Sequence, residues 1–120
     1  MASSKSTIDE KKETVISDKI LLKHALLNVL EYAIKETHMG GTIDIDHKID
    51  AEYHSIAITD SGKGISKLDV KNMMEKKNTD KDRDELEIAK DIISILNGGL
   101  VIESNLGSGA TITLRFPRNI

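Results

Sequence analysis

The spacing of apolar residues changes along this chain between a helical and an extended period, and this change constrains the fold most. Over residues 19–37 apolar side chains recur every three or four positions, which predicts an amphipathic helix. Ser17 or Asp18 is expected to cap its start, and a glycine pair beginning at Gly40 is expected to end it. The same period returns over residues 86–96, before a second glycine pair. The sequence therefore predicts two substantial helices.

Other segments alternate between apolar and polar residues, as strands with one buried face do. These segments are residues 42–46, 55–59, 100–103 and 111–116. A short strand over 14–18 and a short helix over 66–77 are also predicted. Helices segregated from strands that lean towards antiparallel pairing indicate an α+β fold. We expect a two-layer α/β sandwich, in which a mixed, mostly antiparallel sheet carries the helices on one face.

Length and charge limit the classes of function that remain. A chain of 120 residues fits one domain, which we place at residues 13–120 behind a flexible N-terminal segment at 1–12. The absence of cysteine excludes disulfides and thiolate sites. A net charge of −3 does not favour nucleic acid, and no apolar run is long enough for membrane insertion. We expect a cytoplasmic domain.

Three motifs follow one another in an order that is typical of one family. They are NVLEYAIKET at residues 28–37, DSGKGI at 60–65, and GGLVIES at 98–104 followed by GSGAT at 107–111. In this order the chain resembles the ATP-binding domain of sensor histidine kinases, the GHKL or Bergerat fold that gyrases, MutL proteins and heat-shock chaperones share. The resemblance covers the chain from about residue 15 to residue 117.

The resemblance implies an adenine-binding end of the site. Asp60 would accept a hydrogen bond from the exocyclic amine of adenine, and Gly62 and Gly64 would let the backbone approach the nucleotide. Thr111 would help to hold Asp60 or its water. Asn28 would contact phosphate.

The phosphate end departs from the family pattern. The family places a magnesium-binding asparagine where this chain has Tyr32, and a neutral phenol is a poor ligand for magnesium. The family's second glycine box, whose backbone amides cradle phosphates, is missing, because no glycine occurs between Gly64 and Gly98. Acidic side chains dominate residues 80–87 instead, and only residues 78–83 remain as a lid. The residues therefore predict no metal site.

These observations favour a degenerate histidine-kinase-like domain that senses nucleotides or docks on proteins in two-component-type signalling. We expect weak binding of ATP or ADP, or none, little use of magnesium, and no catalysis by the chain alone. The expected partner is a kinase dimerisation domain or a response regulator. Two alternatives stay open. One is a divergent but active ATP-dependent protein histidine kinase domain, and the other is an anti-sigma-type switch protein.

Overall fold

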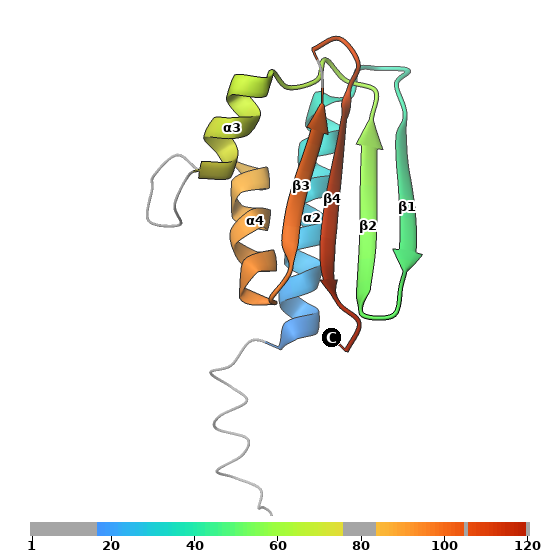
Figure 1. Ribbon diagram of the computed structural model, residues 1–120. Coiled ribbons are helices and arrows are strands. Elements are labelled where there is room, and N and C mark those ends of the chain that lie inside the picture. The colour runs from blue at the N-terminus through green and yellow to red at the C-terminus, as the bar shows by residue number, and fades with distance from the viewer. Residues whose placement is uncertain (1–16, 76–83, 105, 120) are drawn as a thin grey trace, which may run out of the picture.

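The computed structural model describes residues 17–75, 84–104 and 106–119 (Figure 1). Its elements are α2 (Asp18–Glu36), β1 (Ile43–Ile49), β2 (Tyr53–Asp60), α3 (Lys67–Glu75), α4 (Glu85–Ile95), β3 (Gly99–Ser104) and β4 (Ala110–Pro117). The predicted flexible segment 1–12, most of the strand predicted over 14–18, and the lid positions 78–83 lie outside the described residues.

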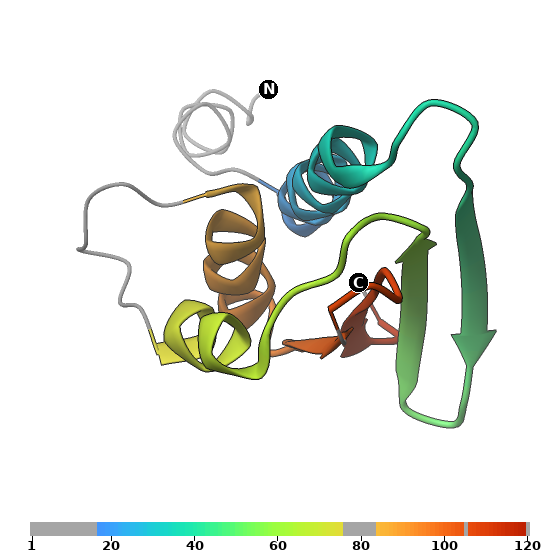
Figure 2. The same ribbon diagram turned by 90° about the horizontal axis from the view of Figure 1, so that it is seen from above.

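The described strands form an antiparallel sheet in the order β1-β2-β4-β3. Helices α2 and α4 pack on one face of this sheet, and α3 lies against α4 at its margin (Figure 2). The predicted α+β two-layer sandwich is confirmed. In this arrangement the end of α2 lies next to the end of β2 and to the loop that follows β2.

The core lies between the two central strands and the helices. Ile58, Ile112 and Leu114 are fully buried on the sheet, and Val29 and Ile93 are fully buried on α2 and α4. Each large aliphatic side chain removed from water contributes about 1.5–3 kcal/mol. This aliphatic core holds the strand ends in place, so that the loops beyond them are positioned by rigid elements.

The helix α2 ends earlier than the glycines suggested. Ser17 caps its start, where its hydroxyl accepts a hydrogen bond from the Ile20 backbone amide at 3.3 Å. At the other end Thr37 turns extended, and both its amide and its hydroxyl donate to the Ala33 carbonyl oxygen. Gly40, with φ of +85°, forms the turn towards β1 instead. The prediction that the glycine pair ends the helix was wrong, because Thr37 caps the last turn first.

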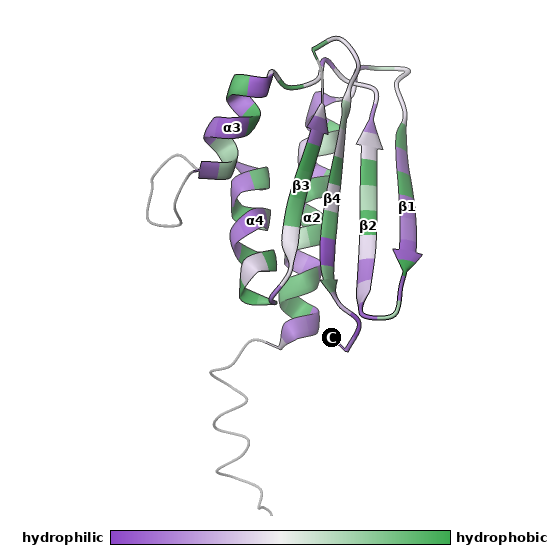
Figure 3. Ribbon diagram, in the orientation of Figure 1, coloured by the Kyte–Doolittle hydropathy of each residue, from purple (hydrophilic) through white to green (hydrophobic). Residues whose placement is uncertain are grey.

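Strand β1 alternates as predicted, but Ile45 and Ile49 are exposed, and only Ile43 at its start packs against the core. Ile45 pairs with Ile58 and therefore points to the same face of the sheet. Apolar and polar residues alternate along β1 (Figure 3). Ile58 is 1% exposed, whereas Ile45 is 60% exposed. Strand β1 is at the edge of the described sheet, beyond the reach of α2 and α4.

None of the described helices is long and apolar enough to cross a membrane.

Candidate functional site

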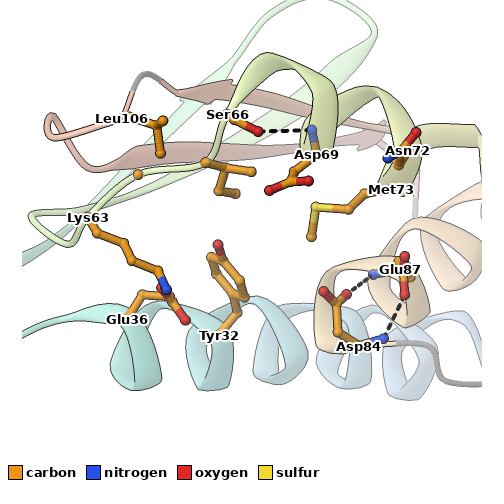
Figure 4. A pocket seen from close by; sticks show the side chains of 12 residues that line it. Tyr32, Glu36, Lys63, Ser66, Asp69, Asn72, Met73, Asp84, Glu87 and Leu106 are labelled. Atoms are coloured by element: carbon orange, nitrogen blue, oxygen red, sulfur yellow. Dashed lines mark hydrogen bonds and ion pairs between the residues drawn. The ribbon is translucent and has the colours of Figure 1, made fainter.

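A cavity of about 630 Å³ opens between the C-terminal half of α2 and the loop that leads from β2 into α3 (Figure 4). The start of α4 closes one side of it. The residues that line it are Tyr32, Glu36, Lys63, Gly64, Ile65, Ser66, Asp69, Asn72, Met73, Asp84, Glu87 and Leu106. A volume of this size suits a small organic ligand.

Asp60 ends β2 just before the loop that forms one wall of the cavity. It is only 3% exposed and lies behind that wall, since it is not among the lining residues. Its Oδ1 accepts a hydrogen bond from the Gly62 backbone amide at 2.8 Å. Its Oδ2 is buried and has no hydrogen-bond partner among the described residues. An unpaired buried carboxylate oxygen is costly, so this atom is suited to accept a hydrogen bond from a ligand or from water.

Two glycines allow the loop after Asp60 to take its path. A Cβ on Gly62 would lie 2.2 Å from the carbonyl oxygen of Glu36, the last residue of α2. Gly64 has φ of +81°, a conformation that side chains other than glycine rarely adopt, and it lines the cavity. Both predicted glycines therefore shape the wall that Asp60 begins.

The structure places Thr111 on the wrong face of the sheet to hold Asp60. Thr111 pairs with Thr59, and their hydroxyl oxygens are 3.0 Å apart on the face turned away from the helices. Successive strand residues point to opposite faces, so the neighbour of Asp60 on β4 is Ala110. The methyl group of Ala110 offers no hydrogen bond to the carboxylate. The predicted role of Thr111 is therefore corrected.

Ser104 ties the end of β3 to the loop that bears Gly64, a contact that the sequence did not reveal. Its hydroxyl donates to the Gly109 carbonyl oxygen at 2.7 Å and accepts from the Ile65 amide at 2.7 Å. This bridge holds two loops that are distant in sequence next to each other, and so it fixes the mouth of the cavity.

The two predicted positions on α2 differ in their relation to the cavity. Asn28 is half-buried and is not among the lining residues. Tyr32, one turn later, projects its hydroxyl into the space towards the opposite wall (Figure 4). Burial, and then the negative charges of Glu36 and Asp60, raise the pKa of the Tyr32 phenol above its usual value. The side chain is therefore a neutral phenol, not an anionic oxygen that could hold a cation.

The start of α4 is closed by its own side chains. The Asp84 carboxylate accepts a hydrogen bond from the Glu87 amide at 3.0 Å, and the Glu87 carboxylate accepts one from the Asp84 amide at 2.7 Å. This capping box satisfies two backbone amides that a helix start can otherwise offer to an anion. It also places both carboxylates in the cavity wall.

The remaining charges make the cavity acidic. Glu36 and Asp69 join the two capping carboxylates, against the single ammonium group of Lys63, which lies 3.9 Å from Glu36. Counted over the described lining residues, the formal charge is −3. Each carboxylate 4 Å from a phosphate would cost about 1–4 kcal/mol, depending on the local dielectric constant.

The residues present fit one part of a magnesium nucleotide and not the other. The unpaired Oδ2 of Asp60 suits the donor edge of adenine, whereas the Tyr32 phenol and the capping carboxylates do not suit a triphosphate with its cation.

Two acidic residues of the cavity wall, Glu36 and Asp69, were not predicted from the sequence. Of these, Glu36 could have been predicted more easily. It lies four positions after Tyr32 and so projects from the same side of the helix. Asp69 gave no local signal.

Comparison with known proteins places this geometry in a family. The model of the histidine kinase-, DNA gyrase B- and HSP90-like ATPase family matches residues 17–120. The chain is 31% identical to sensor histidine kinase SpaK of Bacillus subtilis over 122 residues, covering 92% of this chain and 27% of that protein. It is also 31% identical over 112 residues to sensor-like histidine kinase SenX3 of Mycolicibacterium smegmatis, covering 86% of this chain and 29% of that protein.

Among solved structures, the mycobacterial sensor histidine kinase MprB aligns with a TM-score of 0.71 and 26% identity, over 86% of this chain and 76% of that chain. The chain spans less than a third of the length of the two curated relatives. The family match nevertheless covers all of the described residues. The chain belongs to the histidine kinase-, DNA gyrase B- and HSP90-like ATPase family.

Proposed function

We propose that this domain binds an adenine nucleotide or nucleoside through Asp60, without magnesium, and acts as a regulatory module. The observation that carries the proposal is the buried Oδ2 of Asp60, which has no partner among the described residues. The exocyclic amine of adenine would supply the missing donor. The Gly62 amide already holds the other oxygen of the carboxylate at 2.8 Å, so the group is oriented before a ligand arrives.

The phosphate end supports weak binding of ATP. By the resemblance to the family, Tyr32 would stand where the metal ligand is expected, and the missing glycine box would fall at residues 83–86, where the capping box of Asp84 and Glu87 forms. A ligand that carries few phosphates avoids most of the repulsion from this wall. We therefore expect adenosine and ADP to bind at least as well as ATP.

The proposed partners are proteins of a two-component system. The relatives named above are sensor histidine kinases, and a domain without a competent metal site can still present a nucleotide-dependent surface. A kinase dimerisation domain or a response regulator is the partner that we infer.

A second candidate function is an active catalytic domain that phosphorylates a histidine on another chain. Identities of about 30% to sensor kinases, over most of this chain, favour it. Tyr32 and the acidic lining oppose it.

Isothermal titration calorimetry with adenosine, ADP and ATP, each with and without magnesium, separates these functions. The proposal predicts saturable binding of all three that magnesium does not strengthen. Tight binding of ATP only in the presence of magnesium would sink the proposal and support the catalytic domain. No binding at millimolar concentration would mean that the fold serves as a docking surface alone.

A further inference from the structure

The outer face of α2 carries a row of large aliphatic side chains that the described residues do not cover. Ile20, Leu27 and Ile34 are 50%, 47% and 63% exposed. Each is separated from the next by seven residues, so the three form one stripe, which drifts by only about 20° per heptad. We call these three residues the outer stripe. It extends along about 21 Å of the helix.

The outer stripe lies opposite the side of α2 that builds the core. Val29, which is fully buried, follows Leu27 by two positions, or about 200° around the helix. Seen from above, the sheet and α4 flank α2, and the side of α2 turned away from the sheet faces no other described element (Figure 2). A heptad row of aliphatic residues on such a side is suited to pack against another helix.

The residues that flank Leu27 are symmetric about it. Ile20 and Ile34 lie seven positions before and after, and Lys23 and Glu31 lie four positions before and after. Lys23 and Glu31 are exposed, and neither forms an ion pair within the part of the chain that the structure describes. In these two pairs, the aliphatic row and its flanking charges match their own reversed copy.

We propose that two copies of this chain associate through the outer stripe, as an antiparallel pair of α2 helices related by a two-fold axis at Leu27. In this register Ile20 faces Ile34 of the second copy, and Lys23 lies at the same height as Glu31 of the second copy. A parallel pair would instead place Lys23 beside its own copy and Glu31 beside its own copy. Like-charge repulsion disfavours that arrangement.

The size of the face sets the strength of the association. Three aliphatic side chains from each copy make an interface smaller than stable specific complexes have, which is typical of weak, transient association. We therefore expect a reversible dimer whose population depends on concentration. The inference does not depend on whether the cavity binds a nucleotide.

Sedimentation velocity of the full 120-residue chain, from about 10 μM to about 1 mM, tests the association. We expect the mass to rise from 13.2 kDa towards twice that value. Leu27→Glu places two like charges at the two-fold axis and should keep the protein monomeric throughout. A wild-type mass that stays at 13.2 kDa, or a dimer that survives Leu27→Glu, would overturn the proposal.

A charge exchange tests the antiparallel register. Lys23→Glu and Glu31→Lys should each weaken the dimer by about tenfold, because each creates two like-charged contacts. The double variant recreates opposite charges and should recover the wild-type dissociation constant. Circular dichroism and the thermal midpoint at low concentration report whether each variant remains folded. Failure of the double variant to recover would contradict the register, since loss of helix stability alone predicts additive losses.

Discussion

The two ends of the cavity differ in how their polar groups are satisfied. Behind the loop after β2, the buried Oδ2 of Asp60 has no partner among the described residues, and Gly62 lets the backbone pass close to Glu36. At the start of α4, Asp84 and Glu87 satisfy each other's backbone amides and leave none of these groups for a ligand. One end is organised to receive a donor, and the other is already closed. If the proposed function is right, this difference lets the fold keep adenine recognition while phosphate recognition is weakened.

The largest effect should come from a clash in the loop after β2. In Gly62→Ala the new Cβ would clash with the Glu36 carbonyl oxygen at 2.2 Å, so we expect a loss of about 1–3 kcal/mol in the free energy of unfolding. Adenosine binding should disappear with it. Gly99→Ala is the matched control, because no atom lies within 4 Å of its Cβ. Chemical denaturation of both variants measures the contrast, and equal stability would contradict the close approach.

The next largest effect should come from replacing one hydrogen-bond acceptor with a donor. Asp60→Asn can keep the bond from the Gly62 amide through its oxygen, but it replaces the unpaired Oδ2 with an amide donor. We expect adenosine affinity to fall by about 10- to 100-fold, since hydrogen bonds to charged groups contribute about 1.5–3 kcal/mol. The thermal midpoint should change little. Unchanged calorimetric affinity would exclude Asp60 as the adenine acceptor.

A gain of binding should follow when the closed end loses its charge. The double variant Asp84→Asn/Glu87→Gln keeps side chains that can cap the helix while it removes two negative charges from the wall. We expect affinity for ATP to rise by about tenfold. Adenosine serves as the internal control, because it has no phosphate that the two carboxylates could repel. Parallel gains for both ligands would show that repulsion of phosphate is not the cause.

The smallest effect concerns the ion pair that joins α2 to the closed end. Lys35 Nζ lies 2.9 Å from Glu85 Oε2, and this hydrogen bond holds the pKa of the Glu85 carboxyl below its usual value. A group with a lowered folded-state pKa stabilises the protein above its unfolded pKa, and this stabilisation is lost as pH falls through the folded value. Glu85→Gln should therefore lower the thermal midpoint slightly at pH 7.

The difference between the wild type and Glu85→Gln should begin to shrink as pH falls below the unfolded-state pKa of about 4.3, and it should close only below the lowered folded-state pKa, where the carboxylate is protonated in both states. A series of thermal scans across this range measures it. A difference that persists in acid would mean that packing, and not the charge of Glu85, is responsible.

Much of the fold could be predicted because its signals are local. The periods of α2 and α4, the two hairpins, and the turn residues all act over a few positions. The exposure of Ile45 could not be predicted, since it depends on where the helices stop across the sheet. The end of α2 could not be predicted from Gly40, because Thr37 caps the last turn before the chain reaches that glycine.

The candidate site likewise contains residues that the sequence predicts and residues that it does not. Asp60, Gly62 and Gly64 belong to one motif and were predicted from it. The face on which Thr111 points depends on strand register, and a shift of one residue reverses it. The acidic wall at Asp69 forms only when α3 folds against the rest, so no short motif could reveal it.

The most direct test of the central claim is to record backbone amide chemical shifts by NMR during titration with ADP, with and without magnesium. The account predicts shifts at residues 60–65 that saturate and do not depend on magnesium, with residues 84–87 unmoved. Magnesium-dependent shifts at residues 84–87 would contradict it, because they would place phosphate and cation at the end that the capping box closes.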